Sequence, residues 1–309
     1  MTREGEGRLL CVSVDIDSVA HYVALYGEDV DDRAARALTA QTYSDGVRRF
    51  LELFEELGVA GTFFAVGRDL EVPAAAGVLR DAAGAGHEIA NHTWSHPYDL
   101  IHRSPEGIQE EIVRGHEIIA DVAAAPRGFR APGYNTSDAV LESLRDLGYR
   151  YDASPLPSWP YLAVKYAVMA GVRLRGGRSA SIVGNPRMGI GRIDPWVDRG
   201  LLRIPCTVTR WTRLPVIGTS LVALPSRLRA HLVRDAAGRA VISLELHAVD
   251  LMDVAGDRLP SILARQADLA IPWQTKRARL AAAIRGMCEA REAVPLAAAA
   301  DRLQGCNPA

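Results

Sequence analysis

Strand-like and helix-like segments alternate along the first half of this chain, and this alternation limits its possible folds more than any other feature. The apolar, β-branched run Leu9–Ile16 is typical of a buried strand. Residues 42–57 follow with apolar side chains at helical spacing, and Gly58 stands where a glycine ends a helix. The same pairing recurs as far as a strand at residues 149–151. It favours a parallel sheet with helices outside it, either doubly wound or closed into a barrel.

The remaining pattern extends this α/β architecture to the end of the chain. Further strands are predicted at residues 60–66, 87–91, 128–130, 201–209, 240–247 and 293–296. Helices are predicted after Pro73, after the Ser104 cap, after a Thr136 cap and at residues 297–303. Residues 155–200 are rich in Pro, Gly and Arg, and we expect them to form an irregular insertion within a single domain.

Charge and composition exclude several classes of protein. Lys and Arg number 36 and Asp and Glu 37, so no field of one sign attracts nucleic acid. The four cysteines lack any C-x-x-C pair, and the N-terminus lacks a secretory apolar core, so we expect free thiols and a cytoplasmic protein. The apolar stretch 161–174 is too short to span a bilayer and contains Lys165 and Arg173. Peripheral membrane contact and an oligomer are left open.

Two carboxylates and two histidines follow predicted strands. Asp15 and Asp17 are two residues apart, so an extended strand end projects both toward one place, unless they are only solvated turn residues. His92 and His96 are four apart, and a single helical turn would bring both imidazoles to one side. Two histidines with one carboxylate can bind zinc, or iron(II) as in oxygenases. The other histidines, including His21, are expected to be structural or exposed.

Five motifs then occur in order: VDID (14–17), GHEIANHTWSH (86–96), FRAPGY (129–134), YDASPLP (151–157) and LELH (244–247). Together they resemble the polysaccharide deacetylases with a NodB homology domain, also called carbohydrate esterase family four. The resemblance covers residues 9–303. It implies a distorted (β/α)7-type barrel, with residues 1–309 forming one catalytic domain and the insertion at about 155–200.

The resemblance also implies a metal site and a base. Asp17, His92 and His96 would bind a divalent metal, with zinc favoured and cobalt, nickel, manganese or iron(II) as alternatives. Asp15 would be the general base, and Arg130 would pair with it to keep its carboxylate ionised. A divalent cation lowers the pKa of water toward about 7, so a carboxylate can take the proton at neutral pH.

The same family pattern supplies an acid and an oxyanion donor. His247 would protonate the departing amine, with Asp152 fixing the orientation of its ring. The main-chain N–H of Gly133 would donate to the tetrahedral oxyanion.

Three side chains are expected to contact substrate. Leu244 would line a small acyl pocket, and Tyr134, one position later than the tyrosine of the common family pattern, would lie beside the substrate. Trp159 is expected either to stack on a sugar face or to pack the insertion.

The implied activity is hydrolysis of an N-acetyl or N-formyl group from an amino sugar, as a small molecule or linked to a nucleotide or lipid. The family usually has two adjacent aspartates in its first motif, but here Ile16 separates Asp15 from Asp17. The separated arrangement occurs in members that act on substrates other than polymeric chitin or peptidoglycan. A cyclic amide or ureide hydrolase, similar to allantoinases or imidases, is therefore an alternative. An iron(II) oxygenase and a metal-binding module without turnover are less favoured, because base and acid positions are both present.

Overall fold

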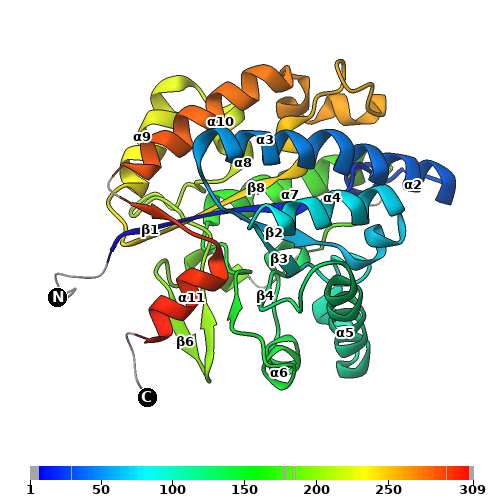
Figure 1. Cartoon of the computed structure of the whole chain (residues 1–309). Coiled ribbons are helices and arrows are strands. Elements are labelled where there is room, and N and C mark those ends of the chain that lie inside the picture. Colours follow the sequence, from blue (N-terminus) through cyan, green and yellow to red (C-terminus); the bar gives the residue numbers. More distant parts are fainter. Residues whose placement is uncertain are drawn as a thin grey trace.

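The protein is an α/β structure built on one curled sheet (Figure 1). The computed structural model describes residues 7–28, 30–176, 179–182, 184, 186–289 and 291–305. Within them the sheet has nine strands in the order β6-β7-β5-β4-β3-β2-β1-β8, with β9 added beside β1. The strands are β1 (Leu9–Ile16), β2 (Thr62–Ala65), β3 (Glu88–Asn91), β4 (Gly128–Phe129), β5 (Tyr151–Asp152), β6 (Trp196–Asp198), β7 (Leu201–Arg203), β8 (Val241–His247) and β9 (Glu292–Ala293).

Most helices pack on the convex side of this sheet, whereas α11 (Leu296–Gly305) packs on its concave face (Figure 1). The longer ones are α1 (Val19–Leu25), α2 (Asp32–Gln41), α3 (Arg48–Leu57), α4 (Pro73–Gly84), α5 (Pro105–Val122), α6 (Asp138–Asp146), α7 (Trp159–Leu174), α8 (Gly218–Ala223), α9 (Ser226–Ala236), α10 (Trp273–Cys288) and α11 (Leu296–Gly305). A π-helical segment, η1 (Thr42–Val47), joins α2 to α3. Short 3-10 segments are η2 (Gly67–Glu71), η3 (Leu100–His102), η4 (Pro132–Tyr134), η5 (Pro186–Ile190), η6 (Ala248–Leu251), η7 (Ser261–Arg265) and η8 (Ala267–Ala270).

The expected distorted barrel is confirmed, as a sheet that curls without closing by regular strands. Only β6 runs antiparallel to its neighbour, β7. The chain after β7 approaches the other edge of the sheet, where the N–H of Thr207 donates to the carbonyl of Ser243 in β8 at 2.9 Å. An isolated bridge between Ile217 and Glu245 continues this contact. Residues outside the regular strands therefore connect the two edges of the sheet, and the carboxyl ends of its parallel strands surround one end of the curled sheet.

The alternation of side chains along β1 separates the core from the site. Val12 and Val14 join the main apolar cluster with Phe50 of α3 and Leu280 of α10. On the concave face, Cys11 packs in a second cluster that includes side chains of α11. Helix α11 fills the amino-terminal end of the curled sheet with apolar side chains. The polar residues of the concave face therefore lie at the carboxyl end of the strands.

Three details of the predicted secondary structure are wrong. Residues 159–174 form the regular helix α7, because Ser158 caps it and Pro160 occupies its first turn; its exposed residues are also apolar, which hides the helical pattern. Ser137, not Thr136, accepts from the N–H of Val140 and caps α6. The strand predicted at 201–209 ends at Arg203, since Pro205 cannot donate to a sheet ladder. The single-domain organisation stays a prediction.

Candidate active site

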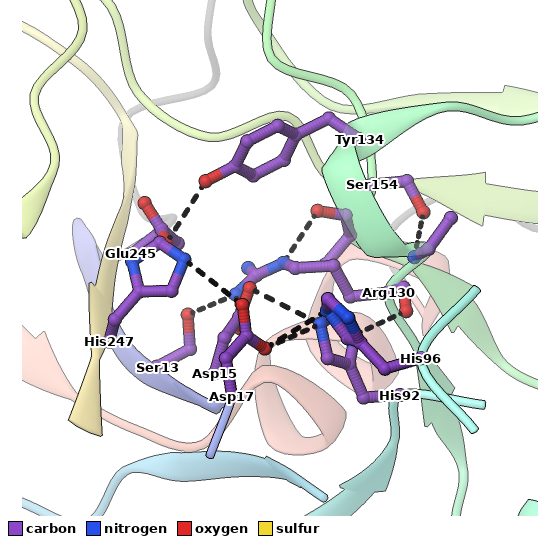
Figure 2. A network of polar contacts seen from close by, with 12 residues as sticks. Ser13, Asp15, Asp17, His92, His96, Arg130, Tyr134, Ser154, Glu245 and His247 are labelled. Atoms are coloured by element: carbon purple, nitrogen blue, oxygen red, sulfur yellow. Dashed lines mark hydrogen bonds and ion pairs between the residues drawn. The ribbon is translucent and has the colours of Figure 1, made fainter. Parts of the chain in front are cut away.

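Strand register brings the expected site residues to one end of the sheet. Asp15 pairs with His247 across β1 and β8. His92 directly follows β3, which lies two strands from β1 on the other side. Figure 2 shows Asp15 and Asp17 between His92 and His96 on one side and His247 on the other. Residues more than 200 positions apart in the chain thus surround one point because parallel strands end at the same edge.

The three expected metal ligands form a compact, buried cluster. Asp17 Oδ1 lies 3.2 Å from His92 Nε2 and 3.1 Å from His96 Nε2. Zinc ligands at about 2.0–2.2 Å from the ion lie about 3.0–3.5 Å from one another, so these separations suit a shared cation. In the described part of the chain, Asp17 Oδ1 and both ring nitrogens of His96 make no hydrogen bond. Unpaired buried acceptors facing one another fit a divalent metal, whose identity the structure does not determine.

Local contacts aim these ligands. The carbonyl of Arg130 lies 2.7 Å from His92 Nδ1, which directs Nε2 toward Asp17, the usual arrangement behind a metal-bound histidine. The helical turn expected to unite His92 and His96 is wrong, because Thr93 and His96 both have positive φ, 70° and 57°. A tight loop brings the rings together instead. The N–H of Thr93 donates to Asn91 Oδ1 at 2.8 Å and holds this loop.

Protonation supports the same reading of the cluster. Burial by itself raises the pKa of Asp17, but His96 and His92 together hold it well below 3.8, so the ligand is a carboxylate. Burial by itself lowers the pKa of His92, but the carboxylates of Asp17 and Asp15 outweigh this effect, so the pKa of His92 is raised. A proton and a cation therefore compete for His92 Nε2, and metal binding should weaken in acid.

Asp15 is held by a buried arginine. Arg130 is fully buried and its Nη1 donates to Asp15 Oδ1 at 2.5 Å and to Ser13 Oγ at 3.0 Å. Its Nε donates to the carbonyl of Ala153, and its guanidinium lies 4.2 Å from the ring centre of Phe64. Burial raises the pKa of the Asp15 carboxyl against the opposing charge of Arg130. The pairing expected between Asp15 and Arg130 is thus present, with the carboxylate 4.0 Å from His92.

His247 has a different carboxylate partner from the one expected. Its Nδ1 lies 2.9 Å from Glu245 Oε1, and its Nε2 lies 3.8 Å from Asp17 Oδ2. The prediction that Asp152 orients His247 is wrong. Residues two apart in a strand share a face, so Glu245 and His247 of β8 point together into the site. The LELH motif itself carries this signal, because Glu245 and His247 are two positions apart in it.

Asp152 instead stabilises the neighbouring loop. Its Oδ2 forms an ion pair with Arg203 Nε at 2.6 Å, and its Oδ1 accepts from Ser154. Ser154 Oγ in turn accepts from the N–H of Ala131 at 2.8 Å. Asp152 therefore acts on the chain leading to Gly133 rather than on His247.

Gly133 and Tyr134 form the tight loop beside the cluster. Both have positive φ, 63° and 66°. A Cβ at position 133 would lie 3.3 Å from Tyr98 and 3.5 Å from Lys165 Nζ, so a side chain there would crowd the site. The Tyr134 hydroxyl donates to Glu245 Oε1 at 3.2 Å, which places Tyr134 behind the His247 partner. The oxyanion role of Gly133 and the substrate contact of Tyr134 stay predictions.

Of the two remaining expected substrate contacts, Leu244 is contradicted and Trp159 stays a prediction. Leu244 lies on the opposite face of β8 from His247, buried in the main apolar cluster with Val12 and Val14, so the prediction that it lines the acyl pocket is wrong. Trp159 begins α7 and is 55% exposed, which leaves it available to a ligand or partner outside the core.

Several residues near the site were not predicted from the sequence. The His21 ring stacks on that of His96 at 4.6 Å, and burial lowers its pKa to about 3. Tyr98 makes an edge contact with His96 at 4.7 Å. Burial also lowers the pKa of Lys165 to about 8. His21 and Tyr98 follow the ligands Asp17 and His96 by four and two residues, so local spacing could have indicated them, whereas Lys165 comes from α7 and approaches the cluster only in three dimensions.

Part of the chain is similar in sequence to known deacetylases. Residues 31–151 match a family model described as polysaccharide deacetylase. Over these residues the chain is similar to this family. Over 150 residues it is 32% identical to the peptidoglycan deacetylase of Helicobacter pylori, covering 47% of this chain and 49% of that protein. Over 118 residues it is 29% identical to a peptidoglycan-N-acetylglucosamine deacetylase of Bacillus cereus, covering 37% and 54%. The chain spans about half the length of these curated relatives.

A shorter match is with a protein assigned to a different substrate. Over 82 residues the chain is 30% identical to a Shewanella sediminis protein assigned as a probable 4-deoxy-4-formamido-L-arabinose-phosphoundecaprenol deformylase, covering 25% of this chain and 26% of that protein.

Solved structures agree on the fold. A Mycobacterium smegmatis structure assigned to the polysaccharide deacetylases has a TM-score of 0.63 at 17% identity, covering 99% of this chain and 93% of that one. Puue allantoinase has a TM-score of 0.61 at 15% identity, with the same coverage. At such identities these likenesses concern the fold alone.

Proposed function

We propose that this chain is a divalent-metal-dependent hydrolase that removes an acetyl or formyl group from the amide nitrogen of an amino sugar. One observation carries the proposal: the Asp17, His92 and His96 cluster lies between an Asp15–Arg130 pair on one side and a Glu245–His247 pair on the other. This arrangement offers a metal, a base and an acid around one reacting carbon.

Asp17, His92 and His96 would hold the cation, which would supply a lowered water pKa and a positive charge for the substrate carbonyl. Asp15 takes the proton of the attacking water. Burial raises the pKa of its carboxyl and thereby its basicity, while the guanidinium of Arg130 fixes the orientation of the two oxygens.

His247 donates a proton to the departing amine, which leaves poorly as an anion. Glu245 accepts from Nδ1, so the proton available for transfer lies on Nε2, the nitrogen nearer Asp17. We further propose that the N–H of Gly133 donates to the oxyanion, since its positive φ belongs to a tight loop that the Asp152–Ser154 contacts hold in place.

Replacing Glu245 by Gln should move the alkaline limit of activity to lower pH. Burial by itself lowers the pKa of His247, but Glu245 raises it well above 6.5, so the protonated acid persists at neutral pH and is lost as the pH rises through that pKa. A neutral amide removes most of this effect, and we expect the descending limb of kcat to shift down by about one pH unit or more. The pH profile of kcat measures this. Glu110→Gln, an exposed carboxylate, is the control; a profile unchanged in Glu245→Gln would contradict the acid role.

The substrate we favour is an amino sugar carried by a phosphate-containing nucleotide or lipid. The relatives named above include one assigned to a formamido sugar on phosphoundecaprenol as well as peptidoglycan deacetylases. Lys165 Nζ approaches Gly133 and supplies a cation near the site, which suits an anionic carrier. Ile16 between the two aspartates also departs from the adjacent pair usual for polymeric substrates.

The deciding experiment measures metal content and then acetate and formate release from N-acetyl and N-formyl amino sugars, free, nucleotide-linked and polyprenyl-linked. Release of either acid that depends on the metal supports the proposal, and indifference to the carrier would contradict the phosphate-linked substrate. Allantoin and cyclic imides belong in the same panel, because the separated aspartates are also a feature of ring-opening members. Turnover of those compounds alone would replace the proposed function with this second candidate. Consumption of oxygen would instead indicate an oxygenase.

A further inference from the structure

The exposed apolar side chains of this protein are concentrated in one segment. In the described part of the chain, every large apolar residue that is strongly exposed lies between positions 159 and 211. Exposure ranges from 48% at Val168 to 89% at Leu174. The exposed members are Trp159, Val164, Val168, Leu174, Ile190, Val197 and Trp211. Single exposed apolar residues are ordinary, but their restriction to one short segment indicates a surface with a partner.

Helix α7 supplies the centre of this surface. Between Ala163 and Ala170 every exposed residue is Ala or Val. A helix that faces water normally carries polar residues on that side. The opposite side of α7 is engaged with the protein, where Tyr161 packs edge-on against Tyr134 at 5.4 Å. The exposed side is therefore apolar although the helix is already anchored through its other face.

Three pieces of chain are tied together here. Ser158 Oγ donates to the carbonyl of Arg213 at 2.6 Å, and Arg213 Nη1 donates to the carbonyl of Gly191 at 2.8 Å. A Cβ at Gly189 would meet the backbone of Trp159 at 3.1 Å, so η5 packs directly on the start of α7. Trp159, Ile190 and Trp211 thus come from neighbouring segments. We call Trp159, Val164, Val168, Leu174, Ile190 and Trp211 the α7 surface.

The positive charge of this segment favours an anionic partner. Between Trp159 and Arg213 the sequence has ten Lys and Arg and two Asp and Glu, in a chain of net charge −1. Two of these cations do not belong to the exposed surface, because Arg203 is buried and paired with Asp152 and Lys165 faces the site. Arg173 and Arg175 are exposed at the end of α7, and the Arg210 guanidinium lies 5.3 Å from the Trp211 ring centre. Apolar side chains with tryptophan and a cationic rim are typical of elements that lie in the interface of an anionic membrane. Two copies meeting through this surface would bring like charges together.

The α7 surface also lies next to the site. Tyr161 and Lys165 on the inner side of α7 approach Tyr134 and Gly133, respectively. One helix therefore separates the candidate active site from the exposed apolar residues. Within the described residues, no helix combines the length and the apolar character that crossing a bilayer requires.

We propose that the α7 surface docks on the surface of an anionic phospholipid bilayer, with its apolar side chains entering the headgroup region and its arginines contacting lipid phosphates. Docking would bring the site to the level of the lipid headgroups. The inference depends on exposed residues alone and holds whatever substrate the site takes.

Vesicle flotation of the full chain tests this proposal. We expect the protein to float with phosphatidylcholine vesicles containing phosphatidylglycerol and to stay behind with phosphatidylcholine alone. Val164→Asp with Val168→Asp should weaken binding to the anionic vesicles by at least about tenfold, because two anions then replace apolar contacts. The matched control is Ala278→Asp with Ala282→Asp, also exposed and four residues apart, on α10; it should bind like the wild type.

A second variant tests the proposal independently, in case the first variant misfolds. Arg173→Gln with Arg175→Gln changes only exposed charges at the end of α7, and it should reduce anionic-vesicle binding while circular dichroism stays unchanged. Wild-type protein that ignores anionic vesicles, or equal binding by the α7 and α10 variants, would overturn the proposal. A dimer lost in the Val164→Asp, Val168→Asp variant, without vesicle binding, would instead assign the surface to self-association.

Discussion

His92→Ala should leave the protein without its metal and lower kcat/KM at least about a thousandfold. The substitution removes one of three ligands from a cluster in which both histidine Nε2 atoms lie 3.1–3.2 Å from Asp17 Oδ1, so the cation loses both a bond and its geometry. Elemental analysis and activity on the best substrate of the panel measure the two effects together.

His102→Ala is the matched control, since His102 is exposed in η3. It should retain wild-type metal content and rate. Full metal content in His92→Ala would show that the cluster does not bind the ion, and the proposed function would fail with it.

Asp15→Asn should lower kcat/KM between about a hundredfold and ten thousandfold while the metal remains bound. Asn cannot take the proton of the attacking water, but Asp15 is not one of the three ligands. The same change leaves the fully buried Arg130 without its counterion, and breaking such a pair from one side costs about 3–5 kcal/mol of folding stability. Kinetics, elemental analysis and urea unfolding test the three expectations.

Asp81→Asn provides the comparison, because Asp81 also pairs with an arginine, Arg48, but both side chains are at least half exposed. Its loss should cost less than about 1 kcal/mol and no activity. Asp15→Asn with a wild-type rate would exclude Asp15 as the base. A wild-type free energy of unfolding would show that Arg130 finds another partner.

Two of the mistaken site predictions, those for Asp152 and Leu244, have one structural cause. Asp152 and Leu244 were given roles from the positions of motifs in the chain, but the direction of a side chain depends on the face of its strand. In β8, positions 245 and 247 face Asp15, and position 244 faces the helices. Asp152 meets Arg203 of β7, a neighbour set by the strand order. Strict alternation along a strand would have identified Glu245 in advance.

The sequence by itself determined the alternating α/β pattern, the resemblance to a known family and the identities of most residues that cluster at the site. Each depends on local spacing or on motifs, which a chain carries before it folds. The tertiary structure decided which carboxylate meets His247, how a loop of positive φ unites His92 and His96, and that one side of α7 stays apolar and exposed. Those features depend on which strands become neighbours and which faces are covered, and long-range packing alone fixes both.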